Sequence, residues 1–270
     1  MNDTWIVTVF VITDDLMHYL EHSSHVLAQV PDPEIVTVAV VAAKYFQNNH
    51  ERALYVLQQL GFLSGTISVS RFNRRLHALA DCLMFIPTTL GEIFADGEVF
   101  VIDSIPAPVC RRVRARRCRK VRGRVFCGYC AAKKEKFFGW RLHLVCTPEG
   151  IPVNFAMLPA SFHDLTPVHE LTANLSPDSR VFGDKAFNSA PDESTLFNDL
   201  GVKLIPVRKV NMKPHTWLDE IDCRDYRHTI ENVNSQLESM GVQRLHARTN
   251  VGFEIKVHAS LIAVTCTNLN

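Results

Sequence analysis

Three acidic residues have types and positions that could do chemistry together. Asp103 follows the apolar run 99–102, Asp184 follows the run 181–183, and Glu231 lies in a helical stretch further along. Carboxylates that lie close together repel one another unless a cation offsets their charge. Two divalent ions held by such groups can activate an attacking oxygen and stabilise the leaving oxygen of a phosphodiester. The pattern therefore predicts a site for two Mg²⁺ ions, which Mn²⁺ could replace.

The third acid has a competitor on the same predicted helix. Arg224, Arg227 and Glu231 are three and four residues apart, so they share one helical face, and Glu238 lies two turns further along it. Arg227 and Glu231 could form an ordinary surface ion pair, worth less than about 1 kcal/mol. They could equally be a phosphate-binding arginine beside a metal ligand. The spacing favours Glu231 over Glu238.

The elements that must position these acids begin with a strand at 99–102. Periodicity and turn residues then predict a series of strands and helices along the rest of the chain. In order, they are strands 137–145 and 151–158, a helix at 164–175, strand 181–183, a helix at 191–200, strand 202–207, a helix at 222–240 and an apolar helix at 252–265. This order predicts the α/β class, a mixed sheet flanked by helices, and it is similar to that of ribonuclease-H-like folds. Sites in such sheets form beyond the strand ends, where Asp103 and Asp184 are expected.

The preceding residues predict a small all-helical N-terminal domain. Helices are expected at 34–46, 51–60 and 71–85, the last with Ser70 as its N-cap and Pro87 just beyond its end. A helix-turn-helix is one interpretation, with DNA-binding residues Arg71, Arg74 and Arg75. A helical bundle whose arginines are merely solvated is the other. The predicted domains are residues 1–96 and residues 97–270, with a basic insertion at 110–136.

The charge of the chain is concentrated in that insertion. The formal net charge of the protein is +1, yet residues 99–136 hold 12 basic and 2 acidic side chains. Such a block gives salt-dependent affinity for a polyanion, and double-stranded DNA is the expected partner, although a solvated loop is the alternative. The predicted DNA contacts are Arg111, Arg112, Arg114, Arg116, Arg117, Arg119, Lys120, Arg122 and Arg124, with Arg227.

The cysteines and the apolar runs indicate the compartment. A chain of this length without a secretory leader does not need a disulfide framework, so the eight cysteines are interpreted as reduced and the location as cytoplasmic. The apolar run 5–12 is far shorter than the roughly 20 residues that span a bilayer, so no membrane association is expected. Zinc at Cys110, Cys118, Cys127 and Cys130 is not favoured, because only the last two have the tight spacing of a zinc site.

Several stretches together resemble the DDE transposases of bacterial insertion sequences. They are SRFNRRLHAL (70–79), VIDSIPAPVC (101–110), FFGWRLHLV (137–145), GIPVNFAMLPASFHD (150–164), VFGDKAF (181–187), LIPVRK (204–209) and RHTIENVNSQL (227–237). The resemblance implies that Asp103, Asp184 and Glu231 are the catalytic metal ligands, Glu231 within a Tyr226, Arg227 and Glu231 signature. That signature often continues to a lysine where this chain has Glu238, which puts one phosphate contact in doubt. Accessory roles are implied for His163, Asp164, Arg208 and Lys209.

The resemblance also implies an activity and its partners. The expected reaction is metal-dependent cleavage at transposon ends followed by strand transfer into target DNA. The expected partners are terminal inverted repeats, target DNA and a second copy of the chain, in a prokaryotic cytoplasm near the nucleoid. Two alternatives stay open: a catalytically decayed DNA-binding derivative, and a ribonuclease-H-like nuclease or resolvase. A nicking assay with Mn²⁺ distinguishes an active transposase from a decayed derivative. Comparing hybrid, branched and transposon-end substrates distinguishes it from a nuclease or resolvase.

Overall fold

The computed structural model describes every residue of the chain except residues 132, 210, 211, 213 and 270. The chain divides into two compact units, one of residues 1–87 with 236–270 and one of residues 88–235. This division differs from the predicted boundary at residue 96, because the C-terminal segment joins the helical unit and not the sheet. Its helix α9 (Asn250–Asn268) is buried along most of its length and packs against the N-terminal helices. An apolar helix covered on most sides belongs with the elements that cover it.

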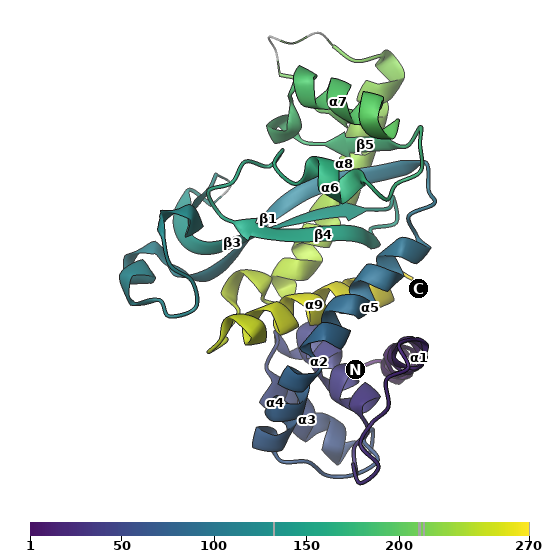
Figure 1. The fold of residues 1–270 in the computed structure, drawn as a ribbon, viewed down its shortest axis with the longest axis vertical. Helices are drawn as coiled ribbons and strands as arrows, with labels where there is room; N and C mark the ends of the chain where they lie inside the picture. Colours follow the sequence, from purple (N-terminus) through teal and green to yellow (C-terminus); the bar gives the residue numbers. More distant parts are fainter. Residues whose placement is uncertain (132, 210–211, 213, 270) are drawn as a thin grey trace. The chain divides into compact units, whose positions relative to one another are not determined.

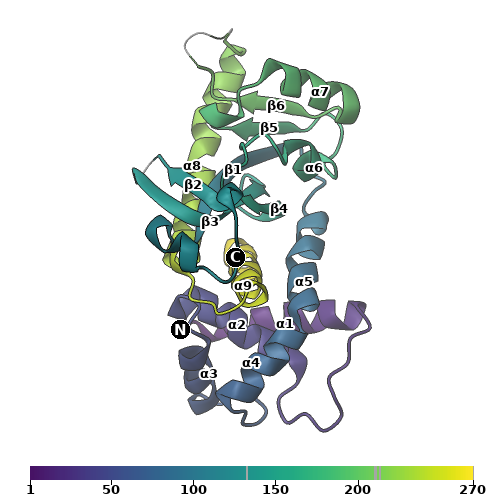
Figure 2. The same cartoon turned by 60° about the vertical axis from the view of Figure 1, so that its left-hand side comes forward.

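The helical unit is built around α2, whose residues are buried from Asp32 through Ala43. Helices α1, α3, α4 and α9 each pack against other members of this group (Figure 2). The bounds of the first four helices are α1 Asp3–Tyr19, α2 Asp32–Phe46, α3 His50–Gln59 and α4 Val69–Ala78. Two of the predicted helices therefore match α2 and α3. The apolar run near the N-terminus lies in α1, and among the described residues no helix is long and apolar enough to cross a membrane.

The predicted helix at 71–85 was wrong in its bounds. The structure has two helices there, α4 and then α5 (Ala80–Ile93), and Pro87 lies inside α5 instead of ending it. The cap is Ser68 and not Ser70, because the Ser68 side chain accepts a hydrogen bond from the third backbone N–H beyond it. Proline disfavours a helix interior, but buried side chains on either side of Pro87 outweigh that local preference.

The second unit contains a six-stranded mixed sheet in the order β2-β3-β1-β5-β6, with β4 also paired to β3. Strands β1, β2, β3 and β4 pair antiparallel, whereas β1, β5 and β6 run parallel. The bounds are β1 Val99–Arg111, β2 Cys127–Cys130, β3 Glu135–Cys146, β4 Pro152–Pro159, β5 Arg180–Gly183 and β6 Lys203–Pro206. A meander followed by parallel strands and helices is the ribonuclease-H-like arrangement, so the predicted fold class is confirmed.

Helices cover both faces of this sheet. On one face α6 (Val168–Thr172) and α7 (Ala190–Leu200) close an apolar core with alternate residues of the strands, including Val181 (Figure 1). On the other face the next residue, Phe182, packs its ring against Tyr226 of α8, with the ring centroids 5.2 Å apart. Helix α8 spans Trp217–Ser239. Successive strand residues point to opposite faces, so β5 contacts helices on both sides.

Two predicted boundaries in this unit were also wrong. The strand expected to end before Asp103 continues to Arg111, because β3 pairs with β1 along that whole length. The helix expected at 164–175 is the short α6, preceded by turns. The basic insertion at 110–136 includes residue 132, which lies outside the described residues. Its described part holds the end of β1, the short helices Arg112–Arg117 and Arg124–Phe126, strand β2 and the start of β3.

Candidate active site

Two carboxylates lie side by side where two parallel strands part. The register of β1 and β5 ends with the pair Ile102 and Gly183. The next residues are Asp103 on β1 and Asp184 after β5. Strand β5 stops there while β1 continues beside β3, so Asp103 loses its neighbour on one side. The sheet thus brings two acids that are distant in sequence to the same level at one edge.

Asp103 is held in an environment that disfavours its charge. Burial raises the pKa of its carboxyl to about 6, and the charge of Asp184 adds to the rise. Hydrogen bonds from the backbone N–H of Ser104 and from the Asn234 side chain oppose it. The Asn234 amide lies on α8 and donates to Oδ2 of Asp103 at 2.7 Å. The amide therefore fixes the carboxylate while the surroundings leave its charge incompletely compensated.

Asp184 begins a short 3-10 turn, Lys185–Phe187, and caps it. Its Oδ1 accepts a hydrogen bond from the backbone N–H of Ala186 at 2.7 Å. Burial raises the pKa of Asp184, and the charge of Asp164 adds to this, whereas the N–H of Ala186 and the charge of Arg227 lower it. Asp184 is thus oriented by the backbone, as Asp103 is oriented by a side chain.

A cavity of about 290 Å³ opens between these aspartates and α8. Its lining includes Asp103, Asp184, Lys185, Arg227 and Glu231. Glu231 is 52% exposed and its Oε1 accepts a hydrogen bond from Nε of Arg227 at 2.7 Å. All three predicted acids therefore line one cavity, but the third is directed to an arginine in this structure.

The competing acid on α8 falls in a different compact unit. Glu238 belongs to the helical unit, because the division of the chain runs between residues 235 and 236. Glu231 belongs to the sheet unit and lines its cavity. This location favours Glu231 as the partner of the two aspartates.

A fourth carboxylate, Asp164, lies close enough to influence both aspartates through its charge. It accepts hydrogen bonds from Oγ of Ser104 at 2.6 Å and from Nη1 of Arg141 at 3.2 Å. Nδ1 of the buried His143 lies 4.0 Å from the same Oδ1 atom. Burial lowers the pKa of His143 to about 4, and the charge of Asp164 opposes that change. Asp164 is therefore anchored by the strands on which Asp103 and its neighbours lie.

His163 does not share this environment. It is exposed, and its Nδ1 accepts a hydrogen bond from the backbone N–H of Leu165 at 3.3 Å. The histidine thus stabilises a turn, and only the aspartate of the predicted pair reaches the acidic group.

The donor atoms at the cavity fit a hard divalent cation. Mg²⁺ prefers carboxylate oxygens. Burial, followed by the charge of Asp184, raises the pKa of Asp103, so its ionised form is disfavoured and a bound cation would stabilise it. Within the part of the chain that the structure describes, no three His, Cys, Asp or Glu side chains are gathered into a metal-binding arrangement. Glu231 is paired with Arg227 through its Oε1 atom and is not gathered with the aspartates.

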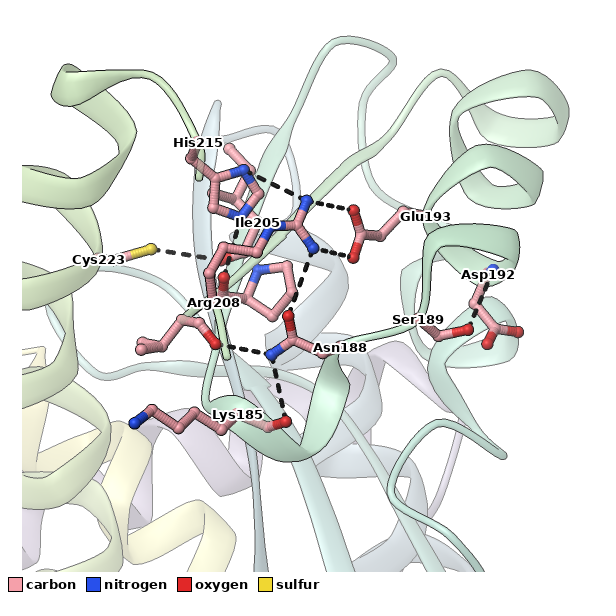
Figure 3. A network of polar contacts seen from close by, with 11 residues as sticks. Lys185, Asn188, Ser189, Asp192, Glu193, Ile205, Arg208, His215 and Cys223 are labelled. Carbon is pink, nitrogen blue, oxygen red and sulfur yellow. Dashed lines mark hydrogen bonds and ion pairs between the residues drawn. The ribbon is translucent and has the colours of Figure 1, made fainter. Parts of the chain in front are cut away.

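Arg208, predicted as an accessory residue, is half-buried and is held by other side chains of the same unit. Both of its terminal nitrogens donate to the Glu193 carboxylate, at 2.6 and 2.7 Å, and the guanidinium also contacts Asn188 and His215 (Figure 3). The same figure shows the Lys185 ammonium directed away from this network. Arg208 thus links the segment after β6 to α7. Lys209, the next residue, is exposed.

The predicted DNA contacts of the insertion lie at its surface. Exposed side chains are those of Arg111, Arg112, Arg114, Arg116, Arg117, Arg119, Arg122 and Arg124, and Lys120 is half-buried. The side chains of Cys110 and Cys118 interact through a hydrogen bond, and each of the two is half-buried. Cys127 and Cys130 stand at the two ends of β2.

The three arginines predicted on the helical unit differ in their surroundings. Arg75 forms an ion pair with Asp32 and also donates to the backbone oxygen of Val30, so it stabilises the loop before α2. Arg71 and Arg74 are exposed. Of the three arginines, Arg71 and Arg74 are therefore the ones accessible to DNA.

The sequence patterns missed two residues that the fold brings close to the aspartates. Asn234 of α8 donates a hydrogen bond to Asp103, and Lys185, which follows Asp184 directly, lines the cavity. Asn234 lies three residues after Glu231, a spacing that places both on one helical face and could have indicated it. Arg141 carried no signal, because its contact with Asp164 depends on how β3 pairs with β1.

Comparison with known proteins identifies the sheet unit. Residues 95–250 match the family described as "Transposase DDE domain". No curated protein and no solved structure matched the chain. The matched range is more than half of the chain, and it includes every residue that lines the cavity.

Proposed function

This chain belongs to the transposase DDE-domain family, and we propose that it cuts DNA at the ends of a mobile element and joins the freed strands to target DNA. The observation that carries the proposal is the placement of Asp103, Asp184 and Glu231 around one cavity. The alignment of Asp103 with Asp184 follows from strand register and does not depend on the family match.

The family acts on DNA with divalent metal ions, and the proposed ions here are two Mg²⁺. Asp103 and Asp184 would hold them, and Glu231 would complete the ligand set of one. Bound there, the ions would supply an activated attacking oxygen and a stabilised leaving oxygen. Asn234 would keep the Asp103 carboxylate oriented through its hydrogen bond.

Two basic residues at the cavity suit a phosphate in this site. Lys185 and Arg227 both line the cavity, and Arg227 is already paired with Glu231. If Glu231 turns to a metal ion, the Arg227 guanidinium is freed to contact a phosphate oxygen. Arginine binds phosphate with two parallel N–H donors, so this exchange would couple ligand assembly to DNA binding.

The exposed arginines of the insertion would hold the DNA outside the cavity. Eight arginines between positions 111 and 124 are exposed. Such a surface binds phosphates with little sequence preference, so recognition of the ends is assigned to the helical unit, with Arg71 and Arg74 as candidates. Joining two ends requires two active sites, and we expect at least a dimer on DNA.

The test is cleavage of a labelled duplex carrying the DNA that flanks the gene, with Mg²⁺ and separately with Mn²⁺. Asp103→Asn and Asp184→Asn should abolish cutting and leave DNA affinity intact, because they remove ligand charge and keep side-chain shape. Asp225→Asn makes the same change at an exposed position of α8 and is the matched control. Cutting by Asp103→Asn at the normal rate would refute the assignment.

The same assay distinguishes the two candidate third acids. Glu231→Gln should abolish cutting, whereas Glu238→Gln should cut at close to the normal rate. The reverse result would show that Glu238 is the ligand and that Glu231 serves only its pair with Arg227.

A further inference from the structure

The helical unit has a cavity of its own, of about 700 Å³. It is lined by the start of α3, one face of α4 and the start of α9, three elements of the same compact unit. The basic side chains on its lining are those of His50, His77, His246, Arg248 and Lys256. Among the residues that line it, Glu51 is the one acid. The cavity is therefore predominantly cationic.

Two helix N-termini open into this cavity. Helix α3 begins at His50, with Asn49 as its cap, and α9 begins at Asn250, with Thr249 as its cap. Each cap side chain accepts one backbone N–H, from Arg52 and Gly252 respectively, and the earlier amides of each first turn have no partner within the helix. Unpaired amides and the helix dipole make such an end favourable for an anion.

The N-terminus of α9 is surrounded by basic groups, whereas a helix N-terminus usually attracts acidic ones. Its first turn contains no acidic residue. Lys256 donates to the backbone oxygens of Asn48 and His246, at 2.8 and 2.9 Å, which holds its ammonium at the cavity. The His77 ring lies so near Gly252 that a Cβ there would be 3.2 and 3.3 Å from two of its atoms. Basic groups beside a positive helix end are unfavourable unless an anion lies between them.

His50 gives a second, independent indication. Its Nε2 atom is buried and has no hydrogen-bond partner, although the residue lines the cavity. One edge of its ring is fixed against Phe72, with centroids 5.9 Å apart. Burial, together with the charges of Lys256 and His77, lowers its pKa to about 3. A buried polar nitrogen without a partner is costly, and a ligand oxygen would remove that cost.

We propose that this cavity binds a phosphate group, and that the phosphate is one of the DNA backbone. The free amides of α3 and α9 would bind its oxygens, Arg248 and Lys256 would offset its charge, and His50 would gain the partner that it lacks. The choice of DNA as the source of the phosphate rests on the proposed function. The phosphate site itself rests on the helix starts and on His50. It would give the helical unit a contact separate from Arg71 and Arg74.

The first experiment uses inorganic phosphate and the full-length protein. Histidine ring signals are followed by nuclear magnetic resonance at neutral pH during addition of phosphate, with chloride at equal ionic strength as reference. His50→Gln assigns the His50 signal. We expect that signal to shift with phosphate and not with chloride. If it does not move with phosphate in large excess, the proposal is overturned.

Calorimetry on variants then tests the lining. Arg248→Gln and His77→Gln should each weaken phosphate binding several-fold, because both side chains are exposed at the cavity. Arg52→Gln removes the same charge from an exposed position of α3 outside the lining and should bind phosphate normally. Equal binding by all three variants and the unchanged protein would also overturn the proposal.

The second experiment measures duplex DNA affinity against salt concentration. Loss of one phosphate contact lowers the slope of log affinity against log salt by about 0.9, and we expect that change for Arg248→Gln but not for Arg52→Gln. If Arg248→Gln weakens inorganic phosphate binding and leaves the DNA slope unchanged, the source is a free phosphate or nucleotide and the DNA assignment is wrong. Asp103→Asn should bind phosphate normally, so failure of the proposed function and failure of this site are distinguishable.

Discussion

Replacing Asp103 by asparagine should stabilise the metal-free protein at neutral pH. The pKa of Asp103 is raised from 3.8 to about 6, first by burial and then by the charge of Asp184. Asparagine has nearly the same shape and keeps an oxygen that can accept the hydrogen bond of Asn234. The variant therefore removes an unfavourable charge without creating a cavity or an unpaired amide.

The size of the effect follows from the pKa. One pKa unit corresponds to about 1.4 kcal/mol, so the ionised carboxylate costs the folded state at most about 3 kcal/mol. Asp103 is partly exposed to solvent, which screens the interaction and reduces the expected gain to about 2 kcal/mol. Because the folded pKa is higher than the unfolded one, the folded protein binds more protons between roughly pH 4 and pH 6, and its stability falls as pH rises through that window.

The assay is urea denaturation in a metal chelator at pH 4, 6 and 8, with Asp225→Asn as the exposed control on α8. The free energies of unfolding of Asp103→Asn and the unchanged protein should be nearly equal at pH 4. The variant should be more stable by about 2 kcal/mol at pH 8. Mg²⁺ should then stabilise the unchanged protein more than the variant, since a ligand stabilises the state that binds it. A variant that is less stable at pH 8, or a difference that does not depend on pH, would refute the reasoning.

Three further predictions test the fold and the DNA surface. Gly91→Ala should lower the free energy of unfolding by roughly 1–3 kcal/mol, because the added Cβ would lie 2.1 Å from the backbone oxygen of Val153. Alanine is the better helix former by about 1 kcal/mol, so a higher melting temperature of the variant would contradict this close approach of Gly91 to Val153. Arg208→Met should lower the free energy of unfolding by roughly 3–5 kcal/mol, because it leaves the Glu193 carboxylate without its ion-pair partner, and DNA affinity should not change. Weaker DNA binding at normal stability would instead show that Arg208 contacts DNA. Glutamine at every arginine of 112–117 should lower the salt slope of DNA affinity by about 3–4, and an unchanged slope would place the DNA elsewhere.

The sequence determined the fold class, and it singled out Asp103 and Asp184 as candidate site residues, because both inferences depend on local patterns. The apolar runs before Asp103 and Asp184 form strands β1 and β5, and the order of elements predicted the mixed sheet. Hydrophobic periodicity is a property of neighbouring residues, so it can be detected without the fold. The family motifs are also local, and the family match confirmed the resemblance.

The bounds of several elements could not be found in this way. Strand β1 continues past Asp103 because β3 pairs beside it, and Pro87 lies inside a helix whose flanking side chains are buried. In each case partners distant in the sequence outweigh the local preference of the residues concerned. The short β2 likewise exists through its pairing with β3.

Only the tertiary structure decided which side chains surround the acids. Asn234 reaches Asp103 across 131 positions of the chain, and Arg141 reaches Asp164 through strand pairing. It also separated Arg208 and Arg75, which are held in ion pairs, from the exposed arginines of the insertion. Residue type gives the chemistry that a side chain can do. Its partners, and hence its charge and freedom to bind a ligand, are set by contacts between segments that no local pattern encodes.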